Sequence, residues 1–310
     1  MSSDQSITIG SLDSVTKNYG TRTALQDVTL TFSSGVTGLL GPNGSGKSTL
    51  IKSLLGLVRV DKGSGEVLGL KWPEDTRKLR DRVGYLPEDD CYIHGLQGIE
   101  SIQMMARLSG FNKTEALRRA HEMADFCDLA QERYRTVETY STGMRQKLKV
   151  AQALVHDPEL IILDEPTTGL DPAQRQQLLD RISVLAKEKG KSIILSTHIL
   201  HDVQRVCDHV IILAGGQVRR VDTLANLQRP SQASLRVAVV AEASQLHRVL
   251  MNRGIQAELT SPQDLVVYGS PDETGEIWKA SHEANVMIQR IEPAKNSLEQ
   301  LFLDVVREGK

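Results

Sequence analysis

A glycine-rich segment between two apolar stretches sets narrow limits on the fold: Gly41-Pro42-Asn43-Gly44-Ser45-Gly46-Lys47-Ser48. The stretch before it, Val36–Leu40, predicts a short buried strand, and the stretch after it, Thr49–Leu57, has the apolar spacing of a helix. Glycines allow the backbone to turn tightly between strand and helix, so that its N–H groups can bind phosphate oxygens. Lys47 would then contact the outer phosphates, and the Ser48 hydroxyl could bind Mg²⁺.

A second apolar stretch, Leu160–Leu163, ends in two carboxylates, Asp164 and Glu165. The end of a buried strand would place Asp164 beside the phosphate-binding segment, where it could bind Mg²⁺. Because side chains alternate along a strand, we expect Glu165 on the other side of the pleat, where it could polarise a water molecule. Acidic residues that end a strand are often only solvated, so this interpretation depends on the phosphate-binding segment.

Strands alternate with helices between residues 28 and 221, which predicts an α/β domain with a mainly parallel central sheet. Further strands are expected at 28–32, 66–68, 83–86 and 191–196, a hairpin at 210–221, and helices at 172–187 and 198–207. The pattern between about 95 and 140 is helical, and another helix follows Ser141. We interpret residues 91–142 as an inserted helical subdomain of a domain that spans 1–222.

The pattern changes after residue 222. Residues 223–233 include Pro230 and several polar side chains, which is typical of a linker. Beyond it, residues 234–310 predict a small α+β domain with the order βαββαβ and a final helix. Its strands are expected at 235–240, 255–259, 264–268 and 286–291, and its helices at 243–252, 272–284 and 297–306. We expect an accessory or regulatory domain.

Charge and composition exclude several classes of protein. Lys and Arg number 37 against 39 Asp and Glu, so the net charge of −2 argues against nucleic-acid binding through bulk positive charge. No apolar run approaches the about 18 residues of a membrane-spanning helix, and no signal peptide is recognised at the polar N-terminus. Three widely separated cysteines suit a reducing cytoplasm. A role at a membrane would therefore require a partner.

Further motifs make the chain resemble ATP-binding-cassette (ABC) proteins. Over residues 6–221 the motifs stand in the order typical of the family, which implies a P-loop NTPase cassette fold. Tyr19 occupies the place of an adenine-stacking aromatic residue. The other matches are Val83–Glu88 to the Q-loop, Tyr140–Gln146 to the LSGGQ signature, Pro166–Pro172 to the D-loop and Ser196–His198 to the switch histidine.

The resemblance implies that two cassettes pair head to tail around two ATP molecules. Each ATP would contact Tyr19 and residues 41–49 of one copy, Thr49 included, and Ser141 and Gly143 of the other. Asp171 would link the two sites.

The resemblance also assigns the chemistry. Glu165 would be the general base, His198 would contact the γ-phosphate together with Lys47, and Mg²⁺ would be bound by three side chains: Ser48, Asp164 and Glu88. Glu88 replaces the usual glutamine of the Q-loop, and Thr142 and Met144 alter the signature. With the YLPE and GMRQK segments, these departures resemble the branch that serves ABC-2-type exporters.

The sequence thus predicts the ATP-hydrolysing subunit of an ABC-2-type exporter, bound through a separate permease to the inner face of the cell membrane. The second cassette is expected to be a copy of this chain, and no direct contact with nucleic acid is expected. The alternatives are a non-transport ABC ATPase acting on nucleic acid or ribosomes, and a module that binds ATP without turnover. A GTPase is disfavoured because the guanine-reading Asn-Lys-x-Asp motif is missing.

Overall fold

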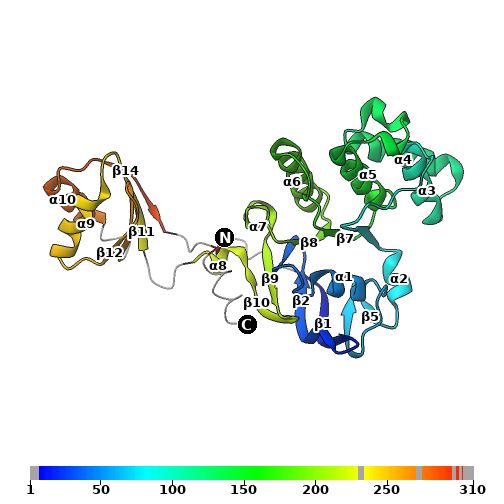
Figure 1. Ribbon diagram of the computed structural model, residues 1–310, viewed down its shortest axis with the longest axis horizontal. Coiled ribbons are helices and arrows are strands. Elements are labelled where there is room, and N and C mark those ends of the chain that lie inside the picture. Colours follow the sequence, from blue (N-terminus) through cyan, green and yellow to red (C-terminus); the bar gives the residue numbers. More distant parts are fainter. Residues whose placement is uncertain (1–6, 230–233, 270–273, 295–297, 300–301, 303–310) are drawn as a thin grey trace. The chain divides into compact units, whose positions relative to one another are not determined.

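The computed structural model describes residues 7–229, 234–269, 274–294, 298–299 and 302. The chain divides into two compact units (Figure 1). Of the described residues, 7–224 and Phe302 belong to the first unit and those from 225 to 299 to the second. The two units are described separately below.

The first unit contains a six-stranded sheet in the order β10-β9-β3-β8-β7-β6. Five strands are parallel, and the edge strand β10 is antiparallel to β9. Every residue of β3, β7 and β8 is buried, which explains the continuous apolar runs and confirms the predicted parallel sheet. The strands are β3 (Val36–Leu40), β6 (Val83–Leu86), β7 (Leu160–Asp164), β8 (Ser192–Thr197), β9 (His209–Ala214) and β10 (Gln217–Thr223).

A second, antiparallel sheet in the first unit has the order β2-β1-β4-β5. The sequence pattern predicted only parts of it, at 28–32 and 66–68, and it missed β1 and β5. Several register irregularities in the pairing of β1 with β2 break the alternation that would have revealed the longer strands. The strands are β1 (Thr8–Tyr19), β2 (Arg22–Ser33), β4 (Lys62–Val67) and β5 (Leu70–Trp72).

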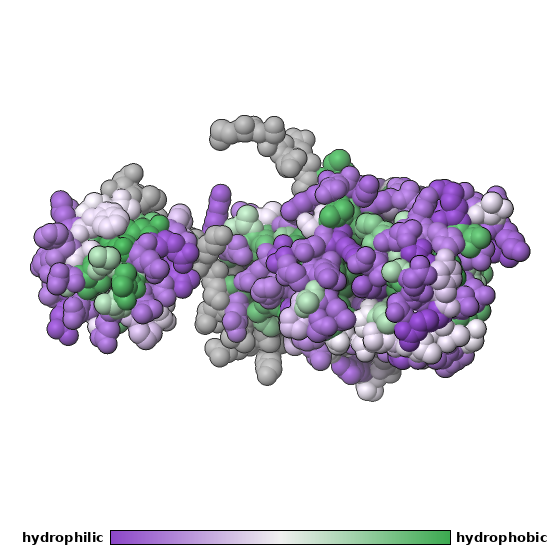
Figure 2. Space-filling model, turned by 90° about the horizontal axis from the view of Figure 1, so that it is seen from above, coloured by the Kyte–Doolittle hydropathy of each residue, from purple (hydrophilic) through white to green (hydrophobic). Residues whose placement is uncertain are grey.

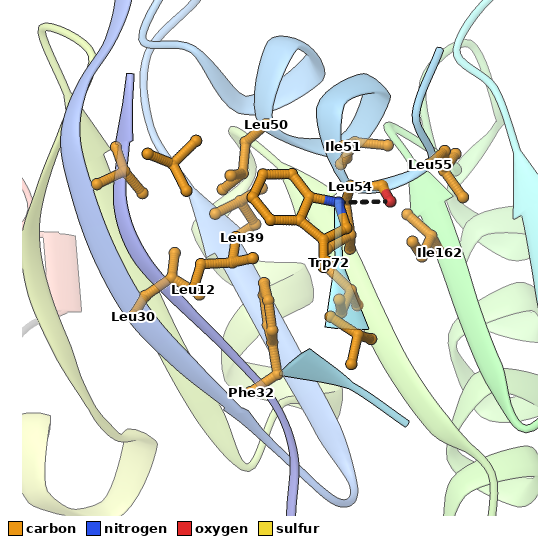
Figure 3. Packing of buried hydrophobic residues seen from close by; sticks show 14 of the residues in the cluster. Leu12, Leu30, Phe32, Leu39, Leu50, Ile51, Leu54, Leu55, Trp72 and Ile162 are labelled. Carbon is orange, nitrogen blue, oxygen red and sulfur yellow. Dashed lines mark hydrogen bonds between the residues drawn. The ribbon is translucent and has the colours of Figure 1, made fainter. Parts of the chain in front are cut away.

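The main core of the first unit contains side chains from both sheets and from helix α1, Lys47–Leu54 (Figure 3). Trp72 lies in this core, and its Nε1–H donates to the carbonyl oxygens of Ser53 (3.3 Å) and Leu54 (3.1 Å). Both carbonyls lie at the end of α1, so the indole caps the helix, and the Ser53 carbonyl also accepts from the N–H of Gly56 at 2.9 Å. Helix α1 overlaps the helix predicted at 49–57, but both its first and its last residue come earlier in the chain.

The inserted helical region is confirmed. Helices α3 (Gly98–Leu108), α4 (Lys113–Phe126) and α5 (Thr142–Leu154) pack against one another. Two short 3₁₀ helices lie between α4 and α5, at Ala130–Tyr134 and Val137–Thr139.

Three of the remaining helices before residue 230 differ from the sequence prediction. Helix α6 (Pro172–Lys187) has the predicted bounds, and α2 (Thr76–Arg80) was too short to show a periodicity. Helix α7 (Leu200–Val206) begins after His198, so this histidine lies in a loop and not on the predicted 198–207 helix. A short helix, α8 (Leu224–Leu227), lies within the segment expected to be a linker.

The second unit has the predicted βαββαβ order, with an antiparallel sheet in the order β12-β13-β11-β14. Its own core includes residues of both helices, among them Leu246, Leu250 and Ile277. Most of the predicted 297–306 helix lies outside the described residues. The elements are β11 (Ser234–Val239), α9 (Ala243–Asn252), β12 (Ala257–Ser261), β13 (Asp264–Tyr268), α10 (Thr274–Glu283) and β14 (Ile288–Pro293).

Among the described residues, no helix combines the length and the apolar character needed to cross a membrane. The face of the first unit seen in Figure 2 is mainly hydrophilic, and its hydrophobic side chains form small separate groups.

Candidate active site

The loop between β3 and α1 has the backbone geometry that its glycines predict. Gly44 and Gly46 have φ angles of 79° and 106°, which are left-handed conformations. A Cβ atom on Gly46 would also lie only 2.7 Å from the carbonyl oxygen of Ala24. This turn leads directly into α1, whose first N–H groups have no partners within the helix and can bind an anion.

Lys47 is buried and lies across this loop. Its Nζ donates to the carbonyl oxygens of Gly41 (2.8 Å) and Pro42 (3.4 Å), and it lies 3.8 Å from Oε1 of Glu165. Burial lowers the pKa of Lys47, while nearby carboxylates, Glu165 first, oppose this shift. The ammonium group is thus held where a phosphate on the loop would meet it.

Glu165 lies between Lys47 and His198. Its second carboxylate oxygen, Oε2, is 2.9 Å from Nδ1 of His198. Strand β7 ends at Asp164, and Glu165 has a φ of 49° with its N–H donating to the carbonyl of Ser196 at 3.0 Å. The pleat argument therefore does not apply to Glu165, because a left-handed residue beyond the strand does not follow strand alternation.

Asp164 is almost fully buried, with 1% of its surface exposed. In the described part of the chain, its Oδ1 atom has no hydrogen-bond partner, and the same is true of the Ser196 Oγ. Burial raises the pKa of Asp164, because the charged form is poorly solvated there. An unpaired buried carboxylate oxygen near Ser48 and Lys47 fits a Mg²⁺ ligand, since hard cations prefer oxygen donors.

A cavity of about 430 Å³ opens beside the loop. Seven of the predicted nucleotide-binding residues line it, including Tyr19 and Thr49, and so does Glu88, which was predicted to bind Mg²⁺. Arg22 was not predicted: it pairs with Tyr19 across the β1–β2 hairpin, and it could have been found only if that hairpin had been recognised. The lining residues are Tyr19, Arg22, Ala24, Asn43, Gly44, Gly46, Lys47, Ser48, Thr49, Glu88 and Glu165.

Ser141, Gly143 and Asp171 do not line this cavity. The exposed Ser141 caps α5, its Oγ accepting from the N–H of Met144 at 3.3 Å. The exposed Asp171 caps α6 in the same way, accepting from the N–H of Gln174 at 2.8 Å. Ser141 and Asp171 therefore belong to a different surface from the Lys47 cavity, whereas Gly143 is buried on α5.

Helix α5 also holds the segment that contains Glu88. The buried Lys149 donates from Nζ to the carbonyl oxygens of Glu88 (3.1 Å) and Asp89 (3.2 Å), and Arg145 pairs with Asp90 at 3.0 Å. The sequence analysis missed Lys149, because a lysine on an amphipathic helix is usually a solvated side chain.

Comparisons with known proteins agree with this geometry. The family model described as "ABC transporter" matches residues 25–168. An ABC transporter ATP-binding protein of Synechocystis sp. is 36% identical over 288 residues, which cover 92% of this chain and 79% of that protein. The Nod factor export ATP-binding protein I of Cupriavidus pinatubonensis is 37% identical over 207 residues, 66% of this chain and 63% of that protein.

A solved ATP-binding subunit of an ABC transporter is 32% identical, with a TM-score of 0.64, and the match covers 71% of this chain and 92% of that one. The phosphate-binding loop, the parallel sheet and the inserted helices define a P-loop NTPase. The chain belongs to the ABC transporter family. It is an ATP-binding and ATP-hydrolysing subunit of a transporter, as predicted.

Proposed function

We propose that Glu165 is the general base for ATP hydrolysis and that Lys47, His198 and the 41–49 loop bind the phosphates. The observation that supports this most directly is the position of the Glu165 carboxylate, within 3.8 Å of Lys47 Nζ and 2.9 Å of His198 Nδ1. Glu165 would take a proton from the attacking water, whose oxygen forms a bond to the γ-phosphorus as the bond to ADP breaks. Lys47 and the loop N–H groups would stabilise the charge on the phosphates.

We propose Ser48, Asp164 and Glu88 as the side chains that hold Mg²⁺. The unpaired Oδ1 of Asp164 supports this assignment. When bound, Mg²⁺ neutralises phosphate charge and orients the phosphate oxygens. Tyr19, half exposed at the cavity wall, would stack on the adenine.

We propose that the complete site forms between two copies of the chain. Ser141 and Asp171 are exposed and lie outside the Lys47 cavity, so a second copy would be needed to bring Ser141 and Gly143 to a bound ATP. A hydroxyl group and a backbone N–H at the start of a helix suit a γ-phosphate.

The chain would energise a separate ABC-2-type permease in export from the cytoplasmic face of the membrane. The named relatives are transporter subunits, and one of them is named for export. Those names and the net charge of −2 favour transport over the alternative function on nucleic acid or ribosomes. Co-purification of the chain with a membrane permease from solubilised membranes tests this proposal.

We assign nucleotide binding to residues 1–222 and an accessory role to residues 234–310, with 223–233 as the linker. All residues that line the Lys47 cavity come from the first of these segments.

The Glu165→Gln variant tests the catalytic assignment. It should bind ATP normally but lose about 10²–10⁴-fold in hydrolysis rate, because the base is removed. With ATP and Mg²⁺ it should elute as a dimer in size-exclusion chromatography. Glu159→Gln is the matched control, since Glu159 is exposed and pairs with Arg82 away from the cavity. A Glu165→Gln variant with the parental rate would refute the assignment.

A further inference from the structure

Asp202 is a fully buried carboxylate that the ATP-binding motifs do not include. It lies on α7, shortly after His198, and it accepts two hydrogen bonds from side chains on other elements. Thr167 Oγ1 donates to Oδ2 at 2.6 Å, and Arg175 Nε donates to Oδ1 at 2.6 Å. Thr167 precedes Asp171 and Arg175 follows it, so Asp202 holds the chain on both sides of Asp171.

The segment from Glu165 to Asp171 is short and internally hydrogen-bonded. The N–H of Thr168 donates to the carbonyl of Glu165 at 3.2 Å, and the N–H of Leu170 donates to that of Thr167 at 3.3 Å. A shift of the Thr167 side chain would therefore move Glu165 and Asp171 together. Thr167 itself is buried, with 3% of its surface exposed, so water cannot replace the missing donor easily.

The hydrogen bond between Thr167 and Asp202 is costly to break because both side chains are buried. A buried carboxylate that loses a donor keeps its desolvation penalty, so breaking the contact costs more than an ordinary exposed hydrogen bond. Asp202 is thus bound to Thr167 of the 165–171 segment and to Arg175 on α6 by contacts that resist opening. The N–H of Asp202 donates to the carbonyl of Ile199, the residue after His198, at 3.1 Å. A displacement of His198 would therefore reach the Asp171 segment through Asp202.

We propose that Asp202 is a positioning residue that couples His198 to the Asp171 segment, so that occupation of one ATP site alters the surface offered to the other. This inference rests on the proposed pairing of two cassettes. Asp202 does not line the Lys47 cavity, and it acts through Thr167 and Arg175.

The test compares Thr167→Val with Thr167→Ser in the full-length chain. Valine has nearly the shape of threonine but lacks the donor, whereas serine keeps it. Thr167→Val should lower kcat about 10-fold, the cost of one hydrogen bond to a charged group, with KM for ATP within about 2-fold of the parent. Its Hill coefficient for ATP should fall to 1, and Thr167→Ser should retain the parental kcat and coefficient. A parental coefficient of 1, or an unchanged coefficient in Thr167→Val, would overturn the proposal.

Hydrogen exchange without nucleotide separates this proposal from the proposed catalytic function. The amides of Thr168 and Leu170 should exchange faster in Thr167→Val than in Thr167→Ser, because the segment is released from α7. Equal exchange in the two variants would refute the positioning role even if hydrolysis by Glu165 is established. Loss of the catalytic assignment through Glu165→Gln would leave the exchange difference intact.

Discussion

Asp164 and Asp61 have the same side chain, but the first is buried and the second is exposed. Asp164 is buried with an unpaired Oδ1, and burial raises its pKa. Asp61 is exposed. It accepts from the N–H of Asn18 at 2.6 Å and pairs with Lys17 at 3.6 Å, and these contacts lower its pKa, the Asn18 N–H contributing most. The charged form of Asp164 therefore weakens the nucleotide-free fold, and that of Asp61 supports it.

Asp164→Asn should raise the free energy of unfolding of the nucleotide-free protein at pH 7, because a buried charge is replaced by a neutral amide of the same shape. The gain should shrink as the pH falls through the raised pKa of Asp164, since the parent carboxyl then becomes neutral too. Urea unfolding at pH 7 and at lower pH measures both effects. The same variant should lose Mg²⁺-dependent hydrolysis.

Asp61→Asn is the control with the opposite sign. Its parent carboxylate contributes stability above the unfolded pKa, and this contribution is lost as the pH falls through the lowered folded pKa. Asp61→Asn should therefore be less stable than the parent at pH 7. An Asp164→Asn protein that is also less stable at pH 7 would contradict the argument.

Helices α4 and α5 begin with the same type of cap. Asn112 accepts from the N–H of Glu115 at 3.0 Å, and Ser141 accepts from the N–H of Met144 at 3.3 Å. Asn112→Ala and Ser141→Ala should each cost about 1 kcal/mol of unfolding free energy. Only Ser141→Ala should lower the ATPase rate of the folded protein, because its hydroxyl is proposed to meet the ATP of a second copy. Equal rates in the two variants would contradict that role.

Trp72 links strand β5 to the end of α1. Trp72→Phe should cost about 2–4 kcal/mol of unfolding free energy, because it leaves a cavity and removes the donor to the Ser53 and Leu54 carbonyls. Trp278→Phe is the matched control: Trp278 is 54% exposed, so its loss should change stability by less than about 0.5 kcal/mol. Denaturant titration of both variants measures the two losses of unfolding free energy. Equal losses would refute the capping role of the indole.

Among the described residues, each of the two units contains a hydrophobic core of its own. It also has two tryptophans, and each unit contains one of them. The fluorescence of Trp72 therefore reports on the first unit, and that of Trp278 on the second.

We expect two unfolding transitions, with ATP and Mg²⁺ stabilising only the one reported by Trp72. At a nucleotide concentration about 100 times the Kd, the gain should be about 2.7 kcal/mol. Trp278→Phe and Trp72→Phe isolate the two signals in urea titrations with and without nucleotide. An equal shift of both transitions would show that the units unfold together.

Features that depend on residues close together in the chain could be predicted from the sequence alone. The apolar runs of β3, β7 and β8 identify buried parallel strands, because a strand covered on both faces needs no polar side chain. The glycines and Lys47 identify the phosphate-binding loop, because only those residue types suit its backbone and its charge. The βαββαβ order of the second unit could also be predicted, because the spacing of apolar residues differs between strands and helices.

Features that depend on residues far apart in the chain could be seen only once the chain was folded. Glu165 is oriented by a left-handed residue whose N–H donates to Ser196, and Arg22 reaches the cavity from an irregular hairpin. The buried Asp202 accepts hydrogen bonds from Thr167 and Arg175. The spacing of apolar residues along the chain does not indicate these contacts. Burial and hydrogen bonding set the charge state and direction of a side chain, and both arise only when distant segments pack together.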